Sequence, residues 1–225
     1  MFDETPPSPP MQRARGRAAV ALSASGGRTR LAGLRQEGCA KAFLPRVTGA
    51  PEVVFLNTAG GLTGGDRLDY ALTLAPGGAA TATTQTAERA YAAPEGAAAA
   101  ALGVTIEVGA GARLDWLPQE TILFDRAALR RTTEIALAGD ARLLTCEALV
   151  LGRAAMGEAV ARLALSDLRR ITRDGRPVTV EPVEIGDAVL ARRAAPAGLA
   201  GARALATVAL VAPGAEDAAG ALRGL

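Results

Sequence analysis

The feature that most restricts the fold is a series of short segments in which apolar and polar residues alternate. Alternation with a period of two places every second side chain on one face of a strand. It is clear in residues 104–108 and 161–165, and Val178 and Val180 continue it after a turn-forming sequence at 174–177. Other glycine-containing turn signals lie at residues 76–78, 94–96, 109–111 and 139–140. Many short strands separated by turns predict a mainly β protein, built as a large β-sandwich or a barrel-like array.

Helical patterns are few and the chain shows no internal linker. Residues 187–195 and 215–222 predict one or two short helices. Residues 205–212 form an apolar run, which predicts a buried strand. Residues 1–18 are rich in Pro and Arg and predict a disordered tail. We therefore expect residues 19–225 to form a single β domain.

The composition excludes most familiar enzyme mechanisms. The chain has no histidine, a single lysine, Lys41, and two cysteines, Cys39 and Cys146. Without an imidazole, Ser-His-Asp and Cys-His catalysis and zinc sites that need a histidine ligand are excluded. Any acid–base chemistry would fall to carboxylates, tyrosines or thiols.

Other classes of function also lack support in the composition. The net charge is only +2 and aromatic residues make up 3% of the chain, which argues against a nucleic-acid partner. No apolar run reaches the roughly 18 residues of a membrane span, so no membrane partner is expected. Two cysteines do not make a disulfide framework, and the first ten residues do not resemble a signal peptide. We therefore expect a cytoplasmic protein with reduced thiols.

A glycine-rich loop stands out between two strand-like segments. Residues 57–66 read Asn-Thr-Ala-Gly-Gly-Leu-Thr-Gly-Gly-Asp, with four glycines. Glycine accepts positive φ angles and close backbone contacts, so the loop predicts a tight turn. One interpretation is the corner of a β-hairpin. The other is a backbone cradle from which Asp66 points at a ligand, although no lysine follows as a phosphate-binding loop requires.

Two carboxylates lie within otherwise apolar strand segments. In residues 142–150, alternation places Cys146 on an apolar face and Glu147 beside Thr145 on the other face. A charged side chain there needs a partner, water or an ion if it is buried. Glu147 could pair with an arginine such as Arg153 or face solvent, and Glu181 has the same character. We expect Cys146 to be a thiol in the core rather than a metal ligand.

Four motifs in this order resemble the UreD/UreH family of urease accessory proteins. They are the glycine-rich loop, Thr-Thr-Gln-Thr-Ala-Glu-Arg-Ala-Tyr at residues 83–91, Leu-Asp-Trp-Leu-Pro-Gln-Glu at 114–120 and Leu-Gly-Arg-Ala-Ala-Met-Gly-Glu at 151–158. The resemblance extends from about Ala21 to Leu222. Family members usually continue beyond the end of this chain, so we expect the C-terminal part of the family fold to be missing and a sheet edge to be exposed.

The resemblance implies a scaffold rather than an enzyme. Such proteins bind UreF, recruit the GTPase UreG through it, and dock on apo-urease to support nickel insertion into its active site. By position, Asp66, Glu147 and Glu181 match acidic residues of a proposed water-filled nickel route. The resemblance therefore implies transient passage of Ni²⁺ and no tightly bound cofactor.

The chemistry of these carboxylates is compatible with passage of a dication. Oxygen ligands bind Ni²⁺ less tightly than imidazole or thiolate ligands do, and spaced carboxylates ease the movement of cations. We expect Asp66, Glu147 and Glu181 to face one hydrated space, and alanine at each to lower nickel delivery without unfolding the chain. Two alternatives stay open. One is a carboxylate-dependent hydrolase such as a glycosidase, and the other is an adaptor without a metal path, in which Asp66 only caps its loop.

Overall fold

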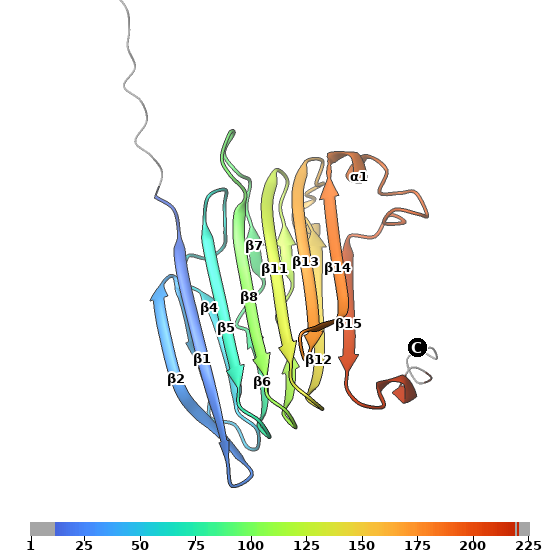
Figure 1. Cartoon of the computed structure of the whole chain (residues 1–225). Helices are drawn as coiled ribbons and strands as arrows, with labels where there is room; N and C mark the ends of the chain where they lie inside the picture. The colour runs from blue at the N-terminus through green and yellow to red at the C-terminus, as the bar shows by residue number, and fades with distance from the viewer. Residues whose placement is uncertain (1–11, 219, 221–225) are drawn as a thin grey trace, which may run out of the picture.

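The computed structural model describes residues 12–218 and residue 220, and it consists of two layered β-sheets (Figure 1). The first sheet has, in spatial order, β14 (Arg176–Gly186), β13 (Leu163–Arg173), β11 (Ala127–Leu137), β8 (Ala100–Val108), β5 (Arg67–Leu74), β1 (Arg15–Ser25) and β2 (Arg28–Gly38). The second sheet has β3 (Ala40–Phe43), β4 (Glu52–Asn57), β6 (Ala79–Thr84), β9 (Arg113–Trp116), β12 (Arg142–Leu151), β10 (Thr121–Leu123) and β7 (Glu88–Ala90), with β15 (Ala204–Val211) paired to β12. The prediction of a mainly β fold is confirmed.

Successive strands alternate between the two sheets along most of the chain. Within the first sheet, β5, β8, β11 and β13 are parallel neighbours, and each connection between them includes a strand of the second sheet. Parallel neighbours always require such a crossover, which here is a strand rather than a helix. Gly77, Gly111 and Gly139 adopt positive φ angles at the reversals, so the predicted turns at these positions are confirmed.

The hydrophobic core lies between the sheets and is one continuous cluster of buried side chains. Burial alternates along β8, β11 and β12, as the period of two predicts. The largest fully buried side chains come from both sheets; they include Phe55, Leu72, Ile106, Leu114 and Trp116. Charged residues on these inner faces are therefore enclosed by apolar neighbours.

The helices are short. The predicted helix over 187–195 is the five-residue α1 (Asp187–Ala191), and 3-10 turns form η1 (Ala154–Met156) and η2 (Ala215–Ala218). The end of the predicted helix over 215–222 falls largely outside the described residues. Within residues 12–218 and 220, no helix has the length and apolar character that crossing a membrane requires.

Two predictions about the ends of the domain are wrong. Strand β1 begins at Arg15 and Ala18 is fully buried, because this segment pairs in parallel with β5, so the predicted tail does not extend to residue 18. Residues 1–11 lie outside the described part of the chain. The segment predicted as a buried strand is β15, which pairs with β12 on one side only, and its Val208 side chain is 60% exposed.

Candidate functional site

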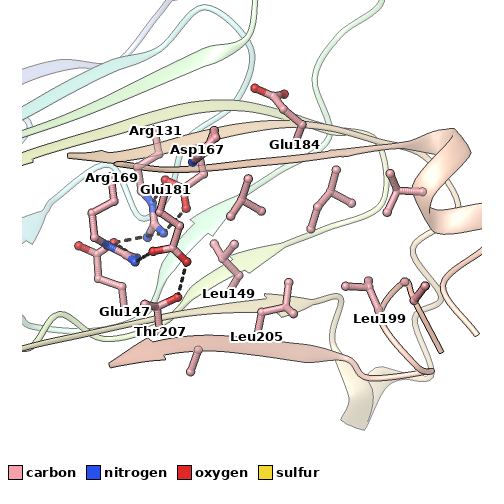
Figure 2. A pocket seen from close by; sticks show the side chains of 17 residues that line it. Arg131, Glu147, Leu149, Asp167, Arg169, Glu181, Glu184, Leu199, Leu205 and Thr207 are labelled. Carbon is pink, nitrogen blue, oxygen red and sulfur yellow. Dashed lines mark hydrogen bonds and ion pairs between the residues drawn. The ribbon is translucent and has the colours of Figure 1, made fainter. Parts of the chain in front are cut away.

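Strand register brings five charged side chains together between the sheets, near the edge formed by β14 and β15 (Figure 2). We call these residues, Arg131, Glu147, Asp167, Arg169 and Glu181, the charged cluster. In the first sheet, Arg131 is the cross-strand partner of Asp167, and Arg169 is the partner of Glu181. In the second sheet, Glu147 lies opposite Thr207. The cluster is thus assembled from pairs that are far apart in the sequence.

Arg131 is the most completely bonded member of the charged cluster. Its Nε and Nη2 atoms donate to the two carboxylate oxygens of Asp167, at 2.9 and 2.5 Å. Nη1 donates to Thr121 Oγ1 at 3.2 Å, and Nη2 also lies 3.3 Å from Glu147. Bidentate pairs of this kind fix the guanidinium plane as well as its charge.

Glu147 connects the two sheets. Its Oε2 accepts a hydrogen bond from Arg169 Nη2 at 3.0 Å, and its Oε1 accepts one from Trp116 Nε1 at 3.0 Å. Burial by itself would raise the pKa of this carboxyl, but Arg131, Arg169 and the hydrogen bonds outweigh burial and lower the pKa below its ordinary value. Glu147 is therefore ionised inside the protein.

Arg169 uses two of its three guanidinium nitrogens in hydrogen bonds within the described chain. Its two Nη atoms reach Glu181, at 2.5 Å, and Glu147, but its buried Nε has no hydrogen-bond partner within the described chain. Thr207 Oγ1 donates to the other oxygen of Glu181 at 2.8 Å. Two guanidinium groups and three carboxylates give the charged cluster a net charge of −1.

A cavity of about 410 Å³ lies beside the charged cluster, between β14 and β15. All five cluster residues line it at one end. Figure 2 shows Leu149, Leu205 and Leu199 extending away from the charged end, toward α1. The cavity therefore has a charged end at the charged cluster and a mainly apolar end toward α1.

Two smaller cavities continue from the charged cluster into the protein. Each has a volume of about 30 Å³, which is enough for one or two water molecules. Arg131 and Glu147 border both the large cavity and the first small one. The two small cavities share Tyr70, Thr84 and Glu88. The second also borders residues 60–61 of the glycine-rich loop, so three separate cavities with shared lining residues lie between the sheet edge and that loop.

Glu88 is a carboxylate of this interior space that the sequence interpretation missed. It is half-buried, and Asn57 Nδ2 donates to its Oε1 at 3.2 Å. Within residues 12–218, no arginine or lysine forms an ion pair with it. Burial, only partly opposed by the bond from Asn57, raises the pKa of Glu88 to about 7. The sequence feature that could have identified Glu88 is its position within the motif at residues 83–91, which resembles the UreD/UreH family.

Asp66 lies apart from these carboxylates. Its two oxygens accept hydrogen bonds from the backbone N–H groups of Ala14 and Thr63, both at 2.8 Å. Among the described residues, those that line the three cavities do not include Asp66. Its carboxylate caps the loop and ties it to the start of β1, so the expectation that Asp66, Glu147 and Glu181 face one space holds in this structure only for the two glutamates.

The glycine-rich loop is not the corner of a hairpin. It joins β4 of the second sheet to β5 of the first, so these two strands do not pair. Gly61 has a φ of 149°, and a Cβ atom added there would lie 2.3 Å from Tyr91 Cε2. The glycines therefore allow an arch between the sheets with close packing against β7.

The prediction of which face of β12 points into the core is also wrong. Glu147 lies on the buried face with Leu143 and Leu149, whereas Cys146 lies on the half-exposed face and is not a core thiol. Arg153 pairs with Glu158 rather than with Glu147. Both faces of this strand carry apolar side chains, so alternation alone did not identify the inner one.

The sequence interpretation missed Arg131 and Arg169, although the period-two alternation of β11 and β13 places both on the apolar faces of their strands. In β13, Leu165, Asp167, Arg169 and Ile171 share one face and are all buried. A period-two reading of that strand places two charged residues on its apolar face, which is the signal for a buried ionic group. What it does not reveal is the partner, because Glu147 and Glu181 come from other strands.

The site does not contain a ready-made metal centre. Within the part of the chain that the structure describes, no group of three or more His, Cys, Asp or Glu residues is placed to hold a metal ion. The carboxylates of Glu147, Asp167 and Glu181 are each bonded to an arginine. This arrangement differs from the two carboxyls across an open cleft that glycoside hydrolysis needs.

Sequence comparisons agree with the motif pattern. The family model described as UreD urease accessory protein matches residues 14–225. The chain is 60% identical over 220 residues to urease accessory protein UreD of Cereibacter sphaeroides, a match that covers 97% of this chain and 79% of the relative. It is 55% identical over 220 residues to the protein of the same name from Dinoroseobacter shibae, covering 97% and 76%, respectively. The protein of that name from Paracoccus denitrificans is 51% identical over 218 residues.

Proposed function

Because the chain belongs to the UreD family of urease accessory proteins and so has a role in urease maturation, we propose that it is a non-catalytic scaffold through which Ni²⁺ passes. In this proposal the protein binds UreF and, through it, the GTPase UreG, and the complex docks on apo-urease in the cytoplasm. Nickel is its cargo and no cofactor stays bound. The relatives are likewise named as accessory proteins rather than as enzymes.

The observation that supports the passage is the row of three cavities between the sheets, each bordered by at least one carboxylate. Glu181 and Glu147 border the large cavity, Glu147 and Glu88 border the first small one, and Glu88 borders the second. Carboxylates spaced along a hydrated route lower the cost of moving a dication through protein. Carboxylate oxygens bind Ni²⁺ weakly enough for release, compared with imidazole or thiolate sites. We propose Glu181, Glu147 and Glu88 as the carboxylates of this route and Asp66 as a structural cap.

Reconstituted activation of apo-urease with UreF, UreG and this chain tests the proposal. Glutamine is the informative substitution, because it removes charge while keeping volume and a carbonyl acceptor. We expect Glu181→Gln and Glu88→Gln to lower the rate of nickel incorporation several-fold while co-purification with UreF and UreG is retained. Glu37→Gln, on the exposed edge strand β2, is the matched control and should activate urease normally.

Two results would contradict parts of this proposal. Normal nickel incorporation with both glutamine variants would exclude the interior route and leave an adaptor without a metal path. Urease activation that does not depend on adding the chain would exclude the role as a scaffold. Release of product from a glycoside by the isolated chain would instead favour the hydrolase alternative.

A further inference from the structure

The guanidinium of Arg169 lies between two carboxylates that come from different sheets. Nη1 bonds to Glu181 Oε2 at 2.5 Å and Nη2 bonds to Glu147 Oε2 at 3.0 Å. Glu181 belongs to β14 of the first sheet, and Glu147 belongs to β12 of the second. Two carboxylates that share one guanidinium both attract a positive charge placed between them. Arg169 therefore occupies the space between Glu181 and Glu147.

Arg169 is held less completely than the other arginine of the charged cluster. The residue is only 5% exposed, and its Nε has no hydrogen-bond partner within the described chain. Arg131, in contrast, bonds through all three guanidinium nitrogens. Arg169 also borders the cavity of about 410 Å³, which gives its side chain room to turn away from Glu147. A buried donor without an acceptor makes the present position of Arg169 less favourable than a fully bonded one.

The charge of the cluster selects for a divalent ion. With Arg169 in place, two cations and three carboxylates leave a net charge of −1. If its guanidinium leaves, the remaining Arg131, Glu147, Asp167 and Glu181 carry −2, which a dication neutralises and a monovalent ion does not. The hydroxyl of Thr207, bonded to Glu181, adds a further oxygen at the same place.

We propose that Arg169 occupies a divalent-cation position between Glu147 and Glu181, so that its guanidinium and Ni²⁺ exclude each other there. The inference rests on the proposed passage of nickel and adds the residue that keeps the route closed when no ion is present. Ni²⁺ enters as the guanidinium moves into the large cavity, and the return of Arg169 displaces the ion. A position whose ligands are all oxygens, and to which the guanidinium of Arg169 returns, holds Ni²⁺ only briefly, as a transfer route requires.

Nickel binding by the purified full chain tests this inference without urease. We expect Arg169→Met to bind about one Ni²⁺ per chain at least tenfold more tightly than the wild-type protein, measured by equilibrium dialysis against nickel chloride. Thermal unfolding should show a larger rise in Tm on addition of Ni²⁺ for Arg169→Met than for wild type. Arg35→Met, which removes an arginine paired with Glu37 on β2, should show neither effect.

Two further variants keep the test decisive if Arg169→Met is poorly folded. The triple variant with Arg169→Met, Glu147→Gln and Glu181→Gln has no unpaired buried carboxylate at this position and should lose the gain in nickel affinity. Arg169→Gln keeps a donor for Glu181 but removes the positive charge, and it should gain affinity as Arg169→Met does. Equal nickel affinity of wild type and Arg169→Gln would overturn the inference.

The test separates this inference from the proposed function. If Arg169→Gln gains a nickel site while Glu181→Gln activates urease normally, the cation position exists but the proposed route is wrong. If Glu181→Gln impairs activation while Arg169→Gln gains no affinity, the route stands and Arg169 does not occupy a cation position on it.

Discussion

Replacing Glu147 by alanine should destabilise the protein severely, before any effect on nickel is considered. The Glu147 side chain is 2% exposed. It accepts hydrogen bonds from Trp116 Nε1 and Arg169 Nη2 and lies 3.3 Å from Arg131. Removing it leaves the indole N–H without an acceptor, and it leaves Arg169 with a single acidic partner.

The expected cost follows from those two losses. A buried donor without an acceptor costs about 1–3 kcal/mol, and a charge-assisted hydrogen bond such as that from Arg169 contributes about 1.5–3 kcal/mol. Together they predict a loss of about 2.5–6 kcal/mol, which includes the range of about 3–5 kcal/mol found when one partner of a buried ion pair is removed. Domains of this kind are stable by about 5–15 kcal/mol, so the loss is a large fraction of the total. We therefore no longer expect alanine here to leave the fold intact.

Guanidinium chloride unfolding followed by tryptophan fluorescence measures this loss directly, because Trp116 is the only tryptophan and bonds to Glu147. Glu147→Gln keeps an acceptor for the indole and should lose only about 1–2 kcal/mol. Glu37→Ala, on the exposed edge strand, is the control and should unfold as wild type does. If Glu147→Ala lies within about 1 kcal/mol of wild type, the account of Glu147 as the link between the sheets is wrong.

Three further outcomes are expected. Gly61→Ala should lower the Tm, because the added Cβ collides with Tyr91 and the φ of 149° disfavours alanine, whereas alanine at the open, positive-φ turn glycine Gly96 should lower it less. Asp66→Ala should cost about 1–3 kcal/mol and speed hydrogen exchange at the Thr63 amide, which it now caps; unchanged exchange would contradict the cap. The pKa of Glu88 is raised from 4.5 to about 7, so the folded state keeps a proton that the unfolded state loses as pH rises between these values. Glu88→Gln should therefore match wild type at pH 4 and be more stable by up to about 3 kcal/mol at pH 8, and equal pH profiles in thermal unfolding would refute this.

Much of the local structure could be predicted from the sequence. Alternation and glycine turns depend on the pleat of the backbone and on the φ angles that each residue allows, which are local properties. Strands and turns were accordingly predicted where both signals were clear, as in β8 and at Gly111. The motif pattern likewise identified the family. An exposed sheet edge was expected, but β15 was not identified as that edge strand, because an apolar run does not reveal whether a further strand pairs beyond it.

The candidate site could be predicted only in part. Glu147 and Glu181 were singled out as carboxylates within apolar strand segments, and both line the large cavity. Alternation in β13 places Arg169 on an apolar face. Their bonds depend on register between strands and on contact across two sheets, and no local pattern encodes either. The role of Asp66 could not be assigned from the sequence either. A carboxylate that closes a glycine-rich loop has the same sequence whether it binds an ion or caps the backbone.

The sequence by itself thus determined the strands, the turns and the family, because these follow from residue-by-residue preferences and from motif order. Only the tertiary structure decided that the glycine-rich loop crosses between sheets and that the inner face of β12 carries Glu147. It also decided that Arg169 lies between Glu147 and Glu181. These features depend on which strands become neighbours, and the neighbours of Arg169 are set by the pairing of β13 with β14 and by the packing of the second sheet against the first.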